Sequence, residues 1–197
     1  GEAASFEGEI IKQAELGVKF NSGGLRGSLA GFWSDLSNRR SVTFQNTGGG
    51  GVSEVVTTLS SRSWGFEATV DYQIMPALSL TGNVTYSNHE ISDSPNAALV
   101  GKELERKPNW YSNAALVYDD GAFDANFSWN YQSDAFANNA NTVVLPSYSL
   151  FRVGAGYTID LGDDEIRVGA SVFNLFDSQG LAEGSPRVGN GQTAGGE

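Results

Sequence analysis

Between residues 122 and 132, polar and apolar side chains alternate one by one. The two sets are Phe123, Ala125, Phe127, Trp129 and Tyr131 on the apolar side, and Asp124, Asn126, Ser128, Asn130 and Gln132 on the polar side. Side chains of a strand point alternately to opposite faces, so this pattern predicts a strand with one apolar and one polar face. A tilted strand needs roughly 9–11 residues to cross a bilayer, and this segment is long enough.

The same alternation recurs along the rest of the chain and predicts eight main strands in all. The other seven strands are predicted at residues 10–20, 25–36, 63–73, 78–89, 109–118, 147–159 and 165–173. Short turns are predicted at residues 21–24, 74–77, 119–121 and 160–164, and long loops at 37–62, 90–107, 133–146 and after 174. Within the first long loop, residues 42–45 and 55–59 are a candidate short strand pair.

Short turns at one end and long loops at the other are typical of bacterial outer-membrane barrels, whereas a soluble meander has no reason to alternate so regularly. Aromatic residues predicted near strand ends suit the interfacial girdles of such a barrel. They are Trp33, Trp64, Trp110, Tyr118, Trp129, Tyr131, Tyr148 and Tyr157. We therefore predict an all-β fold, namely part of an antiparallel up-and-down transmembrane β-barrel.

Composition narrows the choice of class. The chain is 40% hydrophobic, its mean hydropathy is −0.25 and no apolar run approaches 18 residues, so no transmembrane helix is expected. A net charge of −11 argues against nucleic acid as a partner. The chain holds no cysteine, which excludes a disulfide scaffold and cysteine-based zinc sites. Residues 1–4 do not resemble a signal peptide, so we expect a mature chain or a fragment.

We find no signature of an enzyme, and we expect neither a cofactor nor a metal site. The single histidine, His89, is more readily explained as a structural residue than as a ligand. The acidic run Asp163, Asp164 and Glu165 falls in a short turn, where solvation explains it better than a calcium site does. The glycines at positions 48–51 lack the Lys-Ser/Thr and the helix of a phosphate loop.

Several short motifs, in order over nearly the whole chain, resemble the C-terminal barrel of TonB-dependent outer-membrane receptors. The family's lPsYsl strand and NlFD strand end resemble the sequence at residues 145–150 and 174–177. Further similar motifs are Glu15 to Lys19, Gly65 to Glu67, Gly101 to Pro108, Gly156-Tyr157 and Glu183 to Arg187. Family members have a 22-stranded barrel filled by a plug domain, so the resemblance implies that residues 1–197 form a single partial barrel domain that lacks the plug, the early strands and the closing strand.

The resemblance also implies a function and partners. We expect a fragment of a receptor in the bacterial outer membrane that imports a scarce nutrient by energised transport. A ferric siderophore is the favoured ligand class, and cobalamin or an oligosaccharide remains open. Expected partners are lipid, lipopolysaccharide, the protein's own plug and TonB. The candidate ligand-binding residues are the loop cations Arg39, Arg40, Arg106 and Lys107, which could attract an anionic ferric chelate, although lipopolysaccharide contact or plain solvation would also explain them.

Polar residues of the predicted strands should face the lumen and bind one another, water and the plug. They are Glu67, Asp71, Asn83, Asp124, Asn126 and Asn130. Two alternatives remain at this stage. One is a complete small structural or porin-like barrel of eight strands, although inward-facing glycines at 65, 154, 156 and 169 would fill its interior poorly. The other is a soluble β-sandwich that binds a partner.

Overall fold

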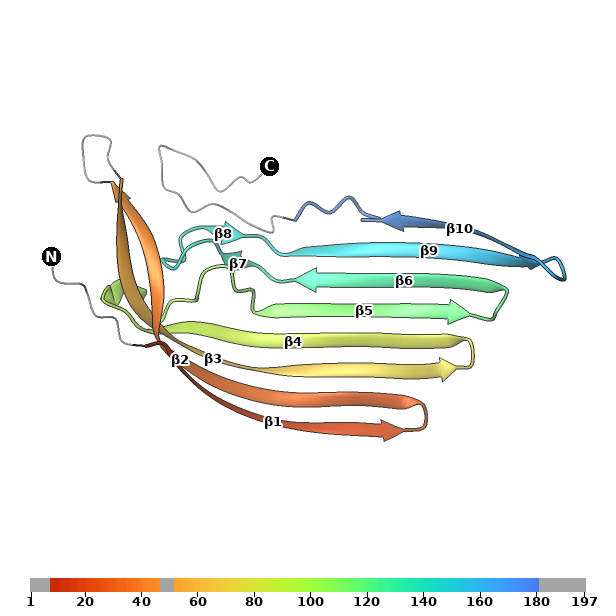
Figure 1. Ribbon diagram of the computed structural model, residues 1–197, viewed down its shortest axis with the longest axis horizontal. Coiled ribbons are helices and arrows are strands. Elements are labelled where there is room, and N and C mark those ends of the chain that lie inside the picture. Colours follow the sequence, from red (N-terminus) through yellow and green to blue (C-terminus); the bar gives the residue numbers. More distant parts are fainter. Residues whose placement is uncertain (1–7, 47–51, 181–197) are drawn as a thin grey trace.

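The computed structural model describes residues 8–46 and 52–180, which form an antiparallel sheet of eight strands (Figure 1). Its strands are β1 (Ile10–Ser22), β2 (Leu25–Asn46), β3 (Val52–Met75), β4 (Leu78–Asp93), β5 (Trp110–Asp119), β6 (Phe123–Gln132), β9 (Tyr148–Asp160) and β10 (Glu165–Phe173). The connections add a 3₁₀ turn, η1 (Ala97–Leu99), and a small hairpin of β7 (Ala135–Phe136) and β8 (Val144–Leu145). The predicted glycine run 48–51 and the motif at 183–187 lie outside the described residues.

The strands follow one another in the sheet in chain order, β1-β2-β3-β4-β5-β6-β9-β10, and every neighbouring pair is antiparallel. The predicted all-β meander of eight main strands is therefore confirmed. In Figure 1 the short turns lie together at one end of the sheet and the long connections at the other. Within the described residues the sheet is open, with β1 and β10 at its two edges. This is not the closed eight-stranded barrel of the alternative interpretation.

The strand register gathers the alternating side chains into two faces. On one face, which we call the polar face, Thr69 of β3 pairs with Asn83 of β4, and Asn83 pairs with Asn113 of β5. The opposite, apolar face carries a ring cluster from β3, β4 and β5. Its centroid distances are 5.6 Å for Trp64–Tyr86, 4.7 Å for Tyr86–Trp110 and 5.8 Å for Phe66–Trp110. The register places all six polar residues expected to face the lumen on the polar face.

Glycines at positive φ allow the tight turns. Gly23 (φ 57°) and Gly24 (φ 82°) are the two loop residues between paired Ser22 and Leu25. Two consecutive positive φ values characterise the type I′ turn, whose twist matches that of the flanking strands. Gly121 (φ 96°) has the same role between β5 and β6, where its N–H donates to Asp119 Oδ1 at 2.9 Å.

The prediction of a long loop at residues 37–62 is mostly wrong, because β2 continues to Asn46 and β3 begins at Val52. Inside that region the predicted short strand pair is confirmed, with Val42 opposite Val56. A register shift between Leu36 and Arg39 separates this extension from the rest of β2. Residues 37–62 show no alternation that continues over their length, so the sequence pattern does not reveal the extension. Because β2 and β3 continue past them, Trp33 and Trp64 pair in mid-strand, not at the predicted strand ends.

The buried core is small and lies at the end with the long connections. It consists of Leu59 of β3, Ile91 of β4 and Leu104 of the β4–β5 loop, with Leu99 of η1 packed against it. Elsewhere the sheet leaves its large apolar side chains exposed, for example Val18 at 62% and Val168 at 62%. Among the described residues no helix is long and apolar enough to span a membrane.

Candidate functional site

The β4–β5 loop, residues 94–109, folds back along the end of β4. Ile91 N–H donates to Lys102 O at 2.8 Å, Gly101 N–H to Ile91 O at 2.9 Å and Leu104 N–H to His89 O at 3.0 Å. These bonds extend the sheet by a short segment of loop, and Leu104 packs into the buried core described above. The loop is therefore held against the sheet and does not hang free of it.

The β6–β9 loop, residues 133–147, lies against the β4–β5 loop. Ser133 Oγ accepts the N–H groups of Asn109 and Trp110, both at 3.1 Å. Arg106 N–H donates to Phe136 O at 2.6 Å. Ala135, Ala137 and Leu145 are at most 4% exposed, so the β6–β9 loop has a packed interior of its own. The two long connections thus form one hydrogen-bonded unit at this end of the sheet.

Arg106 and Lys107 lie in this unit, and both are exposed, as expected of loop cations. Arg106 has a positive φ of 59°. Lys107 is close enough to His89, on the polar face, for its charge to act on the imidazole. A role of Arg106 and Lys107 in ligand binding stays a prediction.

Arg39 and Arg40 lie in β2, not in a loop. They directly follow the register shift, with Arg39 opposite Leu59 and Arg40 opposite Thr58. Successive residues of a strand point to opposite faces, so the two guanidinium groups are not presented together. The sequence suggested a joint cationic site because the strand extension was not recognised.

His89 lies between two serines of the polar face. A hydrogen bond of 2.8 Å joins its Nδ1 to Ser63 Oγ, and one of 2.7 Å joins its Nε2 to Ser87 Oγ. Both ring nitrogens are thus satisfied by neighbours in the sheet, which supports a structural role. Over residues 8–46 and 52–180 no group of three His, Cys, Asp or Glu side chains is arranged to hold a metal ion.

Tyr111 and Tyr148 lie on the polar face, so the prediction that Tyr148 belongs to an interfacial girdle is wrong, and Tyr111 was not among the predicted site residues. Thr85 of β4 pairs with Tyr111 of β5, which pairs with Gln132 of β6, and Gln132 pairs with Tyr148 of β9. Tyr148 Oη donates to Gln132 Oε1 at 3.3 Å. The signal was available in the strand parity, because Tyr111 and Tyr148 stand in the polar series of their strands. They add aromatic and hydrogen-bonding groups to this face near the joined loops.

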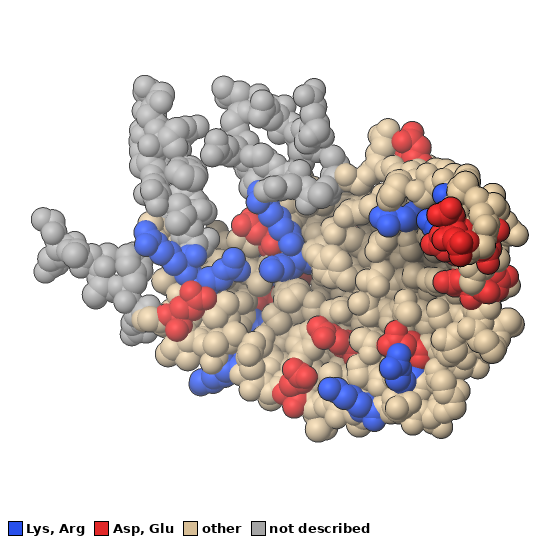
Figure 2. All heavy atoms as spheres, turned by 45° about the vertical axis from the view of Figure 1, so that its right-hand side comes forward, with Lys and Arg blue, Asp and Glu red and all other residues tan. Residues whose placement is uncertain are grey.

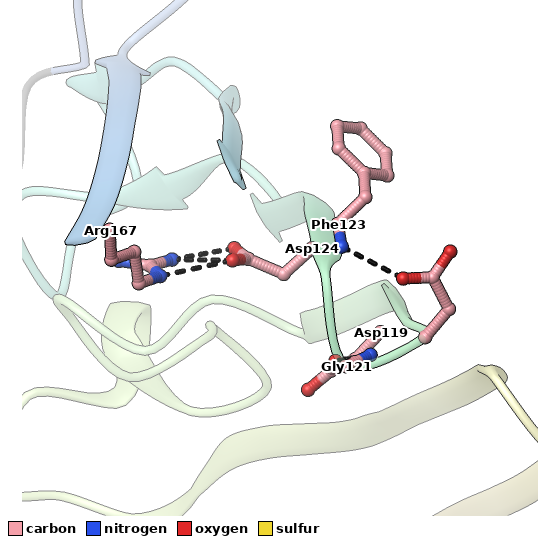
Figure 3. Close-up of polar contacts among 6 residues, drawn as sticks. Asp119, Gly121, Phe123, Asp124 and Arg167 are labelled. Carbon is pink, nitrogen blue, oxygen red and sulfur yellow. Dashed lines mark hydrogen bonds and ion pairs between the residues drawn. The ribbon is translucent and has the colours of Figure 1, made fainter. Parts of the chain in front are cut away.

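Near the short turns, the polar face carries a two-pronged ion pair. Arg167 Nη2 of β10 donates to both carboxylate oxygens of Asp124 of β6 at 2.7 Å, and Nε donates at 3.1 Å (Figure 3). The pair spans β9 directly over Gly156, where a Cβ atom would lie 2.6 Å from both side chains. A planar guanidinium matches a carboxylate in this way with specific geometry. The predicted lumen-facing Asp124 therefore binds another wall residue.

The short-turn end of the sheet is acidic. In Figure 2 its Asp and Glu side chains form a dense group, and those near the turns include Asp119, Asp120, Asp160, Asp163 and Asp164. In the β5–β6 turn, Asp120 Oδ1 accepts the N–H of Phe123 at 2.8 Å and that of Ala122 at 3.0 Å. Tyr118 Oη donates to its Oδ2 at 3.0 Å. The Phe123 N–H first, then the Tyr118 hydroxyl and the Ala122 N–H, hold the pKa of the Asp120 carboxyl below its ordinary value.

These features, an open antiparallel meander with one apolar and one polar face, agree with the comparison to known families. The family described as TonB dependent receptor-like, beta-barrel, matches residues 2–175. The chain belongs to this family of TonB-dependent receptor barrels. Its location is the bacterial outer membrane, as the names of relatives also indicate. The apolar face is thus the lipid-facing surface and the polar face the lumen wall.

The named relatives include receptors and transporters but no enzymes. An iron-regulated outer membrane virulence protein of Vibrio cholerae serotype O1 is 26% identical over 183 residues, which cover 84% of this chain and 27% of the relative. An uncharacterised TonB-dependent receptor of Haemophilus influenzae is 29% identical over 114 residues, covering 57% of this chain and 32% of that protein. The chain therefore spans about a quarter to a third of the length of these curated relatives.

Solved structures show the same fold. The ferric yersiniabactin uptake receptor FyuA from Yersinia pestis superposes with a TM-score of 0.72 at 16% identity, covering 94% of this chain and 27% of that structure. The ferric citrate transporter FecA gives a TM-score of 0.69 at 21% identity, covering 85% and 26%. At these identities the likeness concerns the fold alone. The eight-stranded sheet superposes on about a quarter of each of those chains.

Proposed function

We propose that residues 1–197 form a partial barrel domain of a receptor that imports a ferric siderophore across the outer membrane by energised transport. The family match carries the proposal of energised import. The names of relatives that handle ferric chelates support the ligand class. The plug domain and TonB are the proposed partners in transport, and lipid and lipopolysaccharide are the proposed neighbours of the apolar face.

The charge distribution supports a ligand with negative charge. With a net charge of −11 the chain repels an anion as a whole, so an anionic chelate would need local cations where it enters. Arg106 and Lys107 supply such cations from the joined loops, while the densest acidic group lies at the opposite, short-turn end (Figure 2). Short turns face the periplasm in outer-membrane barrels, so the cations would lie at the extracellular end.

Radioiron uptake by cells that produce the full-length protein and lack other iron receptors tests this proposal. The probes are a trianionic ferric tris-catecholate and an uncharged ferric trihydroxamate. We expect uptake of the anionic chelate that stops when a protonophore removes the energy source. Uptake that continues after the protonophore would indicate a porin-like barrel, and exclusive uptake of the uncharged chelate would refute the anionic ligand class.

A further inference from the structure

The side-chain amide of Asn141, in the β6–β9 loop, makes the two hydrogen bonds with the Glu103 backbone that a neighbouring strand would otherwise make. Glu103 lies in the β4–β5 loop. Its Oδ1 accepts the N–H of Glu103 at 2.8 Å, and its Nδ2 donates to the Glu103 carbonyl at 2.9 Å. Both backbone groups of one residue are thus satisfied by a single amide that is 38 positions away in the chain. Asn141 has a φ of 56°, a conformation in which asparagine is enriched among non-glycine residues.

The contact continues along the same segment. Glu105 N–H donates to Asn139 Oδ1 at 3.0 Å, and Arg106 N–H donates to Phe136 O at 2.6 Å. On its other side, the segment is bonded to the end of β4 through Gly101, Lys102 and Leu104, as described above. Residues 101–106, which we call the strap, are therefore hydrogen-bonded on both sides. Arg106 is the last residue of the strap, and Lys107 follows it directly.

We propose that Asn139 and Asn141 are positioning residues that hold the strap so that Arg106 and Lys107 meet an anionic ligand from a fixed place. This inference rests on the proposed function. Arg106 itself has a positive φ, a conformation that costs free energy in a non-glycine residue unless its surroundings maintain it. Fixing the charges in advance removes the ordering cost that flexible cations would incur on binding.

The loops do not depend on the bonds of Asn139 and Asn141 alone to stay folded. The β7–β8 pairing holds the β6–β9 loop together by itself, and the bonds of Ser133 with Asn109 and Trp110 join the two connections, in both cases without Asn139 or Asn141. Loss of the Asn141 amide should therefore leave the loops folded while it releases one edge of the strap. A glycine is the suitable replacement, because it removes the amide and keeps the positive φ accessible.

Binding of the ferric tris-catecholate to the purified full-length receptor in detergent tests the inference. We expect Asn141→Gly to weaken affinity about threefold to tenfold through lost preorganisation of the charges. Thr142→Ala is the matched control, since the Thr142 hydroxyl accepts the Asn138 Nδ2–H at 2.8 Å within the same loop, and among the described residues it makes no bond to the strap. This variant should leave affinity unchanged. Hydrogen exchange at Glu103 and Glu105 should accelerate in Asn141→Gly and not in the control.

A double-mutant cycle distinguishes positioning from general destabilisation. If Asn141 acts through the cations, Lys107→Gln should weaken affinity less in the Asn141→Gly background than in the wild type. Additive losses, or unchanged affinity in Asn141→Gly while Lys107→Gln weakens binding, would overturn the positioning role alone. If Lys107→Gln and Arg106→Gln both leave affinity unchanged, the anionic-ligand proposal fails, and the positioning role fails with it.

Discussion

At the scale of single residues, glycines of the polar face leave space in which bulkier side chains of neighbouring strands lie over the sheet. Gly65 of β3 lies under the ring of Phe32, and a Cβ atom there would meet Phe32 at 2.9 Å and come closer still to the Tyr86 carbonyl. Gly156 similarly leaves room for the Asp124–Arg167 pair. Gly31, next to it on β2, pairs with Phe66 and so lies on the apolar face, where among the described residues only the Gly65 carbonyl would come within 4 Å of a Cβ atom, at 3.8 Å. These glycines therefore differ sharply in how closely neighbouring atoms surround them.

This difference predicts unequal costs for two alanine substitutions. Gly65→Ala should lower the free energy of unfolding by about 1–3 kcal/mol, because a backbone carbonyl cannot move aside as a flexible side chain can. Gly31→Ala should change it by less than about 0.5 kcal/mol. Urea unfolding of the full-length protein in lipid vesicles measures both. Equal stability of the two variants would show that Gly65 is not crowded as described.

The Asp120 turn predicts a dependence on pH. Its carboxylate accepts hydrogen bonds that hold its pKa below the ordinary value, so the stabilisation is fully present above the unfolded-state pKa and is lost as pH falls through the lower folded-state pKa. The stability advantage of the wild type over Asp120→Ala should therefore be constant near neutral pH and shrink in acid. Unfolding midpoints between pH 7 and pH 3 measure it, and a difference that grows in acid would contradict the assignment.

At the scale of elements, alternation predicted the strands that cross the membrane. For β10 the predicted residues 165–173 coincide with Glu165–Phe173. The β2–β3 extension was not predicted, because residues 37–62 show no polar–apolar alternation that continues over their length. The loop cations Arg106 and Lys107 could be placed from the sequence. The bonds between Asn141 and Glu103 could not, since a side chain that bonds to backbone across 38 positions leaves no local pattern.

The extension also predicts a difference between two adjacent arginines. Arg39 stands opposite Leu59 of the buried core and Arg40 opposite Thr58, so their side chains leave β2 on opposite faces. Only Arg39 shares the face of the core that adjoins the lumen wall. Arg39→Gln should slow association of the anionic chelate about twofold to tenfold at low salt, and Arg40→Gln should not. Stopped-flow association rates measure this, and equal slowing by both variants would contradict the assigned faces.

At the scale of the whole molecule, the sheet is a curved wall with lipid on one side and the lumen on the other. Its apolar face exposes large side chains that a soluble protein would bury, such as Leu16 of β1 at 83% and Val168 of β10 at 62%. Its edge strands β1 and β10 carry backbone groups that lipid cannot satisfy, so in a membrane they require neighbouring strands. We therefore expect this wall to be stable within a larger barrel and not as an isolated sheet.

The most direct test of this account is labelling of single cysteines in the full-length protein on living cells. Residues 1–197 hold no native cysteine, so within this segment only the introduced cysteine can react. Asn96→Cys, in the β4–β5 loop, should react with a membrane-impermeant maleimide on intact cells. Asp163→Cys, in the β9–β10 turn, should react only after the outer membrane is permeabilised. Labelling of Asp163→Cys on intact cells, with Asn96→Cys protected until permeabilisation, would contradict the orientation on which the proposed site depends.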